Sequence, residues 1–150
     1  MGEASPGLLA GLRIIECATF VAGPSGCMAL GQMGADVIRV DPIGGAADFN
    51  RWPLSPRTGA SLYWAALNRG KRSVAVDLRS PEGREIVIGL ATSPGPDAGV
   101  VVDNNVGRPW LSYEALASHT RTSSKCTSRG TPTGGRPSTT RSTPRWESPG

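Results

Sequence analysis

The sequence has few cysteines and no long apolar run. Its three cysteines, Cys17, Cys27 and Cys126, are an odd number without metal-ligand spacing, which argues against a disulfide framework and against a zinc site. No apolar stretch approaches the roughly 20 residues that a membrane helix needs. The N-terminus also lacks the basic segment followed by an apolar one that marks a secretory signal. We therefore expect a cytoplasmic protein without a membrane span.

Positive charge is concentrated near the C-terminus. Residues 1–119 carry a net charge of −1 and residues 120–150 carry +5, which together give the +4 of the whole chain. The high isoelectric point therefore describes a segment and gives weak support for nucleic-acid binding. Residues 120–150 are rich in Ser, Thr, Pro and Gly, and they cannot bury enough surface to offset their ordering entropy. We expect a flexible N-terminus (1–10), one domain (11–119) and a disordered basic tail (120–150).

Strand-length and helix-length segments alternate within the expected domain. Strands are predicted at 12–16, 36–40, 73–77 and 98–102, and helices at 24–33, 61–67, 81–91 and 113–119. Pro24 and Pro81 suit the first position of a helix, Ser80 and Ser112 suit N-caps, and Gly34 suits a helix stop. The alternation predicts an α/β fold with a parallel sheet and flanking helices.

The first predicted strand leads into a turn of small residues, Val21-Ala22-Gly23-Pro24. It ends at a helix N-terminus, whose N–H groups and dipole attract phosphate or carboxylate. Simple turn chemistry would also explain these residues. No G-x-G-x-x-G motif is present, so dinucleotide binding is unsupported.

Two further loops carry candidate ligand-binding residues. Asn68-Arg69-Gly70-Lys71-Arg72 is the densest cationic cluster before residue 120, and its charge suits a polyphosphate, although a solvated turn has the same composition. Asp103-Asn104-Asn105 directly follows a predicted strand. It therefore lies at the carboxyl edge of the sheet, where ligands of open α/β sheets bind. Asn side chains suit an adenine or amide ligand, but they also favour turns.

Three segments, in this order, resemble blocks of the class III CoA-transferases. They are ECATFVAGPSGCMALGQMGADVIRVDPIGG, LNRGKRSVAVDLRSPEGREIV and VVVDNNVGRPWLSYEAL, and the resemblance covers roughly residues 10–119. Within the family, FVAGPSG, DFNRWP and SLYWAALNRGK are most similar to the isomerases that transfer CoA within 2-methylfumaryl-CoA (mesaconyl-CoA). The resemblance implies a Rossmann-like large domain, here incomplete, an acyl-CoA substrate without a metal, and an interlocked homodimer.

The resemblance also implies which residues contact coenzyme A. Val21 and Ala22 are expected near the thioester, Asn68, Lys71 and Arg72 at the nucleotide and its phosphates, and Asn104 and Asn105 beside the CoA channel.

Two features limit what this chain is expected to do. Many family members have a phosphate-binding Arg at the position of Pro42, so this contact is absent or moved. The family's transferases use an Asp nucleophile that forms covalent intermediates, and this Asp belongs to a segment beyond the match. We therefore expect no catalytic residue here, and a CoA-binding N-terminal fragment that is inactive alone. A free-standing CoA- or nucleotide-binding module is the alternative, and nucleic-acid binding through residues 120–150 is a minor one.

A frameshift near Arg121 would explain why the resemblance stops. In the neighbouring frame, GC-rich codons for residues 122–150 permit VIEVHVAGHPDGRPAVDYTVNPEVGVPG. This reading restores an apolar strand, and PDGRPAVDYTVN is similar to the next block of the same subgroup. Sequencing the locus tests this hypothesis, which fails if the neighbouring frame ends or loses the family pattern.

Overall fold

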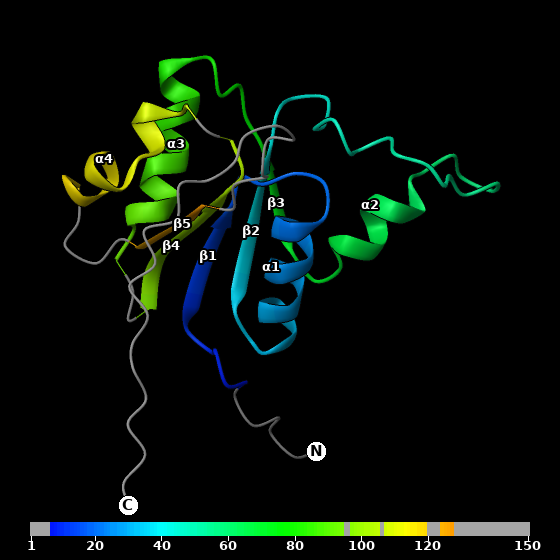
Figure 1. Ribbon diagram of the computed structural model, residues 1–150, viewed down its shortest axis with the longest axis horizontal. Helices are drawn as coiled ribbons and strands as arrows, with labels where there is room; N and C mark the ends of the chain where they lie inside the picture. Colours follow the sequence, from blue (N-terminus) through cyan, green and yellow to red (C-terminus); the bar gives the residue numbers. More distant parts are fainter. Residues whose placement is uncertain (1–6, 95–96, 106, 120–123, 128–150) are drawn as a thin grey trace, which may run out of the picture.

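The computed structural model describes residues 7–94, 97–105, 107–119 and 124–127. Its centre is a parallel sheet with the strand order β3-β2-β1-β4-β5 (Figure 1). The strands are β1 (Leu12–Glu16), β2 (Asp36–Asp41), β3 (Arg72–Ala75), β4 (Asp97–Asp103) and β5 (Ser124–Thr127). The predicted α/β fold with a parallel sheet is confirmed.

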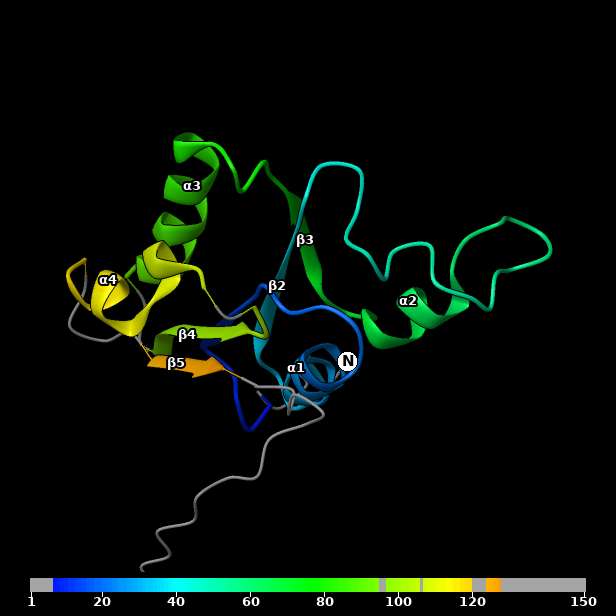
Figure 2. The same cartoon turned by 45° about the horizontal axis from the view of Figure 1, so that its top comes forward.

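Helices cover both faces of this sheet. They are α1 (Ala22–Gln32), α2 (Leu62–Leu67), α3 (Pro81–Thr92), the 3-10 helix η1 (Pro109–Leu111) and α4 (Tyr113–Ala117). Figure 2 shows α1 on one side of the sheet and α3 with α4 on the other. The chain thus forms the expected layers of helix, sheet and helix.

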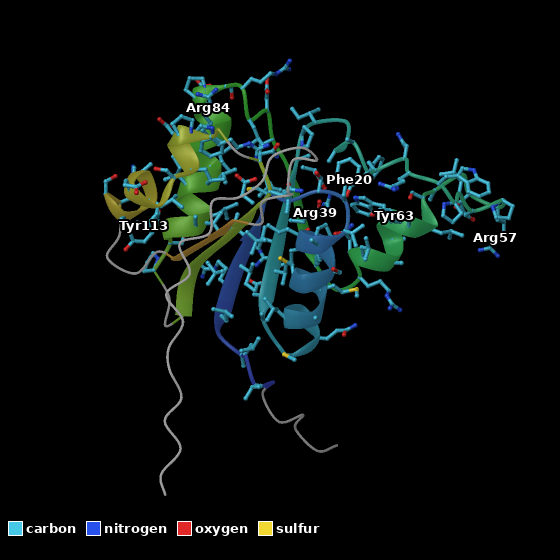
Figure 3. All side chains as sticks on the ribbon, viewed as in Figure 1. Phe20, Arg39, Arg57, Tyr63, Arg84 and Tyr113 are labelled. Carbon is cyan, nitrogen blue, oxygen red and sulfur yellow. The ribbon has the colours of Figure 1, made fainter. Side chains whose placement is uncertain are left out.

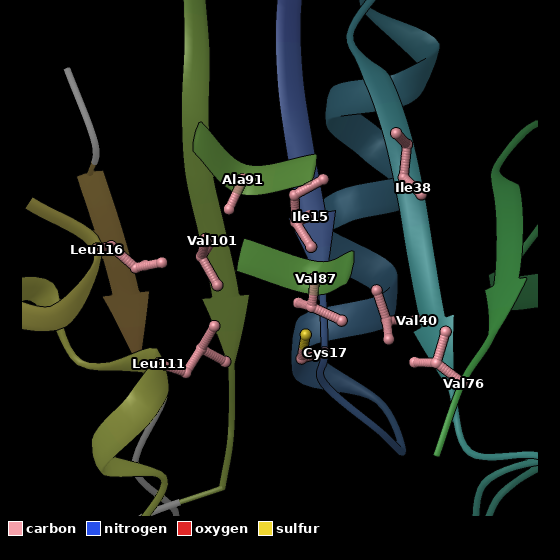
Figure 4. Packing of buried hydrophobic residues seen from close by; sticks show 10 residues of the cluster. All are labelled: Ile15, Cys17, Ile38, Val40, Val76, Val87, Ala91, Val101, Leu111 and Leu116. Atoms are coloured by element: carbon pink, nitrogen blue, oxygen red, sulfur yellow. The ribbon is translucent and has the colours of Figure 1, made fainter. Parts of the chain in front are cut away.

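The alternation of side chains along each strand divides the core into two clusters. On the α3 side, residues of the sheet pack against α3, η1 and α4 (Figure 4). This cluster comprises Ile15, Cys17, Ile38, Val40, Val76, Val87, Ala91, Val101, Leu111 and Leu116. On the α1 side, Ile14 and Val37 pack against Cys27. The second cluster is smaller because the next residues of β1 and β2 on that face, Glu16 and Arg39, are charged.

Local signals set the helix ends largely as predicted. The Ser80 and Ser112 hydroxyls cap α3 and α4 by accepting from Gly83 N at 3.0 Å and from Ala115 N at 3.1 Å. Gly34, with φ of +106°, follows the end of α1, as expected of a helix stop. The predicted start of α1 is wrong by two residues, because the helix begins at Ala22. Pro24 is tolerated there because N–H groups of the first turn have no helical partner.

The expectation of disorder throughout residues 120–150 is wrong for Ser124–Thr127. This segment forms β5, which pairs in parallel with β4 from Val100 to Asp103. A strand edge offers backbone hydrogen bonds to any extended segment, whatever its side chains. The sequence pattern, which reports side-chain periodicity, therefore missed it. The rest of the predicted tail, and residues 1–6 of the predicted N-terminal segment, lie outside the described residues.

A long connection between β2 and β3 extends away from the sheet. Residues 42–61 and α2 project beyond α1 in both views (Figures 1 and 2). Within this connection, Leu54 and Ser61 form an antiparallel bridge. The segment returns to the sheet at the end of α2, where the C-cap residue Asn68 accepts a hydrogen bond from Arg39 of β2. None of the helices in the described ranges has the length and apolarity to cross a bilayer.

Candidate functional site

The carboxyl ends of the parallel strands meet at one edge of the sheet. The chain runs from β1 outward to β2 and β3, then crosses back to β4 on the other side of β1. The order therefore reverses between β1 and β4, and such a switch point is where open α/β sheets bind ligands. The loops that follow β1, β2, β3 and β4 all begin at this edge of the sheet.

Five charged side chains below this edge form what we call the buried ion cluster: Glu16, Arg39, Asp41, Asp48 and Lys71. The Arg39 side chain is 1% exposed. Its guanidinium lies 3.2 Å from Glu16 Oε1, 2.9 Å from Asp41 Oδ2 and 3.0 Å from Asp48 Oδ1. Lys71 Nζ lies 2.7 Å from Glu16 Oε2. The cluster joins β1, β2, the 42–61 connection and the start of β3.

The register of the sheet explains how the cluster forms. Glu16 pairs with Arg39 across β1 and β2, so both side chains point to the same face. Burial alone would lower the pKa of Arg39. The hydrogen bond to Asp41 and the charges of Asp41, Asp48 and Glu16 outweigh it and raise that pKa above the ordinary value of an arginine. The three carboxylates thus hold Arg39 in its charged form inside the protein.

Asn68 and Lys71, which were predicted to meet phosphates, belong to this buried region. The Lys71 side chain is 2% exposed, and its Nζ donates to Asn68 Oδ1 at 2.9 Å and to the Pro24 carbonyl at 2.9 Å. Asn68 Oδ1 also accepts from Arg39 Nη1 at 3.1 Å. These contacts fasten the β3 side of the site to α1. The phosphate contacts stay predictions, since both polar groups are engaged within the protein.

Arg72 is not brought to the same place. Its side chain is exposed and pairs with Asp36 at 3.0 Å, and Asp36 is the first residue of β2. Arg72 therefore lies toward the amino edge of the sheet, away from the loops that follow β1 and β4.

The turn from β1 to α1 is held from both sides. Asp48 Oδ2 accepts from Phe20 N at 2.9 Å. Asn104 Oδ1 accepts from Thr19 N at 3.2 Å, and Asn104 Nδ2 donates to the Thr19 carbonyl at 3.0 Å. Phe20 has a φ of +68°, which costs a residue with a side chain roughly 1–2 kcal/mol. We infer that the contacts of Asp48 and Asn104 maintain this conformation.

This turn, residues 19–22, is called the held turn. It contains the residues that the family resemblance predicts near the thioester. Val21 is 52% exposed, and Ala22, the first residue of α1, is exposed too. Of the two asparagines predicted to border the CoA channel, Asn104 is the one that binds the turn, whereas Asn105 is exposed beside it. The structure therefore brings Val21, Ala22, Asn104 and Asn105 together at the switch point.

A cleft of about 600 Å³ opens at the same edge, beside the start of α3. It is lined by Pro42, Ile43, Asp77, Leu78, Arg79 and Arg108. Arg79 pairs with Asp77 at 3.0 Å. The hydrogen bonds from Arg79 to Asp77, followed by its charge, lower the pKa of that carboxyl below 3.8. Arg108 is 25% exposed and lies 3.5 Å from Asp103, which is fully buried. Two guanidinium groups thus face a cavity of ligand size.

Sequence reasoning missed Arg79 and Arg108. Each follows the end of a strand by a few residues, which is the signal that could have found them. Arg84 of α3 supports the first of these loops, because its side chain donates to the Leu78 carbonyl at 2.9 Å and to the Arg79 carbonyl at 3.1 Å (Figure 3). Pro42, the residue that departs from the family pattern, lines this cleft. The described residues contain no His, Cys, Asp and Glu grouping suited to a metal ion.

Comparison with known proteins gives a consistent result. Residues 9–118 match the model of CoA-transferase family III. The chain is 51% identical over 113 residues to 2-methylfumaryl-CoA isomerase of Chloroflexus aurantiacus, covering 75% of this chain and 28% of that protein. It is 38% identical over 118 residues to succinate–glutarate CoA-transferase of Agrobacterium fabrum, covering 72% and 28%. The resemblance noted from the sequence is confirmed.

A solved structure shows the same arrangement. The crystal structure of a CAIB/BAIF family protein from Brucella suis superposes with a TM-score of 0.69 at 34% identity, covering 82% of this chain and 33% of that one. The chain thus spans about a third or less of the relatives that it matches.

Proposed function

This chain belongs to CoA-transferase family III, and we propose that it is a CoA-binding part of an enzyme that acts on acyl-CoA thioesters. The observation that carries the proposal is the cleft at the carboxyl edge, where Arg79 and Arg108 line a cavity beside the start of α3. Guanidinium groups bind phosphates through paired N–H donors. We assign the nucleotide end of CoA to this cleft and the thioester end to Val21 and Ala22.

The position of Arg79 and Arg108 also bears on Pro42. A proline supplies neither a charge nor an N–H donor, so it leaves phosphate binding to other residues of the cleft. Arg79 and Arg108 are cations that line the same cavity as Pro42. They therefore take over the phosphate contact that the family resemblance places at residue 42.

For the acyl group, the proposal is CoA transfer within 2-methylfumaryl-CoA. The relative with 51% identity is named for isomerising this thioester. Other relatives are named for succinate and glutarate and for D-citramalate. All of these acyl groups carry a second carboxylate. The substrate class that we propose is accordingly a dicarboxylic acyl-CoA.

We further propose that this chain does not catalyse the transfer by itself. A carboxylate nucleophile must be free to attack the thioester carbonyl. The carboxylates nearest the turn are engaged: Asp41 and Asp48 with Arg39, and Glu16 with both Arg39 and Lys71. Asp103 is fully buried beneath Arg108. The described part of the chain therefore offers binding contacts at the turn without a free nucleophile.

Calorimetric titration of the 150-residue chain with CoA tests the proposed function. We expect micromolar binding, weakened about tenfold or more in Arg108→Gln and in Arg79→Gln, because charge-assisted hydrogen bonds contribute about 1.5–3 kcal/mol. Arg57→Gln, which removes an exposed cation outside the cleft, is the matched control and should bind as the parent chain does. Unchanged affinity in both cleft variants would refute the assignment of the cleft.

A chromatographic assay with 2-methylfumaryl-CoA tests the second part of the proposal. The chain should bind this thioester and leave it unconverted. Formation of the isomeric thioester above a protein-free blank would show that the chain is catalytic alone.

A further inference from the structure

We propose that Arg51 binds the free carboxylate of the acyl group and thereby selects dicarboxylic acyl-CoA thioesters over uncharged ones. This assignment rests on the proposed function, and it names the residue that would give the site its substrate class. Arg51 lies in the connection between β2 and β3 and was not among the candidates found from the sequence.

Two aromatic rings hold the guanidinium of Arg51 in place. Its Cζ atom lies 5.5 Å from the ring centroid of Phe20 and 4.8 Å from that of Tyr63. Figure 3 shows Phe20 and Tyr63 on the same side of the sheet, with Tyr63 on α2. Aromatic faces attract a cation without neutralising it or occupying its N–H donors. The guanidinium is therefore oriented but keeps its charge and its donors.

The charge of Arg51 has no acidic partner among the described residues. Arg39, Arg72, Arg79 and Arg108 each lie within ion-pair distance of a carboxylate. Arg51 is exposed. A guanidinium has five N–H donors in a planar fork that matches a carboxylate. An exposed, oriented and unneutralised fork is a suitable receptor for a ligand carboxylate.

The backbone fixes where this receptor lies. Arg51 N donates to the Asp48 carbonyl at 3.1 Å, and the Arg51 carbonyl accepts from the Ser61 hydroxyl. Asp48 also holds Phe20 in its left-handed conformation, and Phe20 directly precedes Val21 and Ala22. The residue that stacks on Arg51 is thus the neighbour of the residues assigned to the thioester. A short acyl chain that starts at the turn would carry its distal carboxylate toward Arg51.

Tyr63 supplies a second, independent sign of a ligand. Its hydroxyl is buried and has no hydrogen-bond partner among the described residues. A buried donor without an acceptor is costly. A carboxylate bound beside Arg51 is an acceptor of suitable charge for this hydroxyl.

Binding measurements with three ligands test the assignment on the full 150-residue chain. Succinyl-CoA carries a terminal carboxylate, butyryl-CoA has the same chain length without it, and CoA has no acyl group. We expect the parent chain to bind succinyl-CoA about tenfold more tightly than butyryl-CoA. Arg51→Gln should remove this preference and leave the affinities for butyryl-CoA and CoA unchanged.

Two further variants keep the test specific. Arg57→Gln removes an exposed arginine from the same connection and should retain the full preference. Arg51→Lys keeps the charge but loses the planar fork, and should retain part of it. Circular dichroism confirms that each variant is folded.

The outcomes separate this inference from the proposed function. If Arg51→Gln keeps the preference for succinyl-CoA, the assignment of Arg51 is overturned and the proposed function stands. If the parent chain binds all three ligands without preference, the assignment of Arg51 and the dicarboxylic substrate class are both overturned, whereas CoA binding by the chain stands. If the parent chain binds none of them, the proposed function fails and the assignment of Arg51 fails with it.

Discussion

Arg39 is the residue on which the carboxyl edge of the sheet depends. It ties together carboxylates from β1, from the end of β2 and from the connection that follows. Its guanidinium also lies 5.7 Å from the ring centroid of Trp64 on α2. A buried ion pair is weak evidence of net stability, but removing one partner leaves an uncompensated buried charge. The contribution of Arg39 to stability should therefore be clearest when its side chain is removed.

Arg39→Met tests this directly. The substitution keeps an unbranched side chain but leaves Glu16, Asp41 and Asp48 without their guanidinium partner. We expect the free energy of unfolding to fall by about 3–5 kcal/mol, as measured by urea denaturation followed by circular dichroism. Arg72→Met breaks an exposed pair and should cost less than about 1 kcal/mol. Similar losses in the two variants would contradict the role assigned to Arg39.

Asp77 provides a prediction about pH. Hydrogen bonds from Arg79 lower its pKa below 3.8, so the folded state binds this proton more weakly than the unfolded state does. The resulting stabilisation is present above about pH 4 and is lost as the pH falls through the lowered pKa. A carbon-13 NMR titration should show the low pKa, and Arg79→Gln should return it toward 3.8. An unchanged pKa in the variant would remove Arg79 as the cause.

At the scale of elements, the turn between β1 and α1 is stabilised by its neighbours rather than by its own residues. Phe20 adopts a φ of +68° in a turn that Asp48 and Asn104 hold from outside. The N-terminus of α1 has no side-chain cap. Contacts made by the β2–β3 connection and by the end of β4 thus determine how the turn faces a ligand.

Asn104→Ala should loosen this turn without unfolding the sheet. The change removes both hydrogen bonds to Thr19. We expect faster amide hydrogen exchange at Thr19 and Phe20 and weaker CoA binding by severalfold. Asn105→Ala, at an exposed neighbour, should leave the exchange at Thr19 unchanged. Equal exchange in the parent chain and in Asn104→Ala would show that the turn holds itself.

Elements with local signals could be predicted from the sequence, and features built from distant residues could not. Ser80 and Ser112 cap their helices as expected because N-capping involves residues three positions apart. The buried ion cluster joins residues as far apart as Glu16 and Lys71, and no spacing along the chain reveals such a contact. A charge inside the strand DVIRV was visible at Arg39, but its partners depend on the register of the sheet.

The same distinction applies to the candidate site. Val21 and Ala22 could be placed at a ligand-binding edge because they follow a strand and begin a helix. Lys71 could not be placed, since its charge is used within the protein. Arg51 could not be identified from the sequence, because its cation–π contacts are with Phe20 and Tyr63, which are distant in sequence from one another.

At the scale of the whole molecule, two sets of charged side chains have different roles. The buried ion cluster lies between the sheet and the segment from α1 to α2, where it fixes the loops. Arg79 and Arg108 line an open cleft beside α3, where they remain available to a ligand. Both sets lie at the side of the sheet where the parallel strands end. The central claim is therefore that CoA binds across this edge, from the cleft to the held turn.

Amide hydrogen exchange of the chain with and without saturating CoA tests this claim most directly. Binding should slow exchange in three separated segments: residues 19–22, residues 77–79 and the loop that ends at Arg108. Residues 36–38 at the amino edge of β2 should exchange as before, as an internal control. Protection confined to the amino edge, or to the basic segment 128–150, would contradict a CoA site at the carboxyl edge of the sheet.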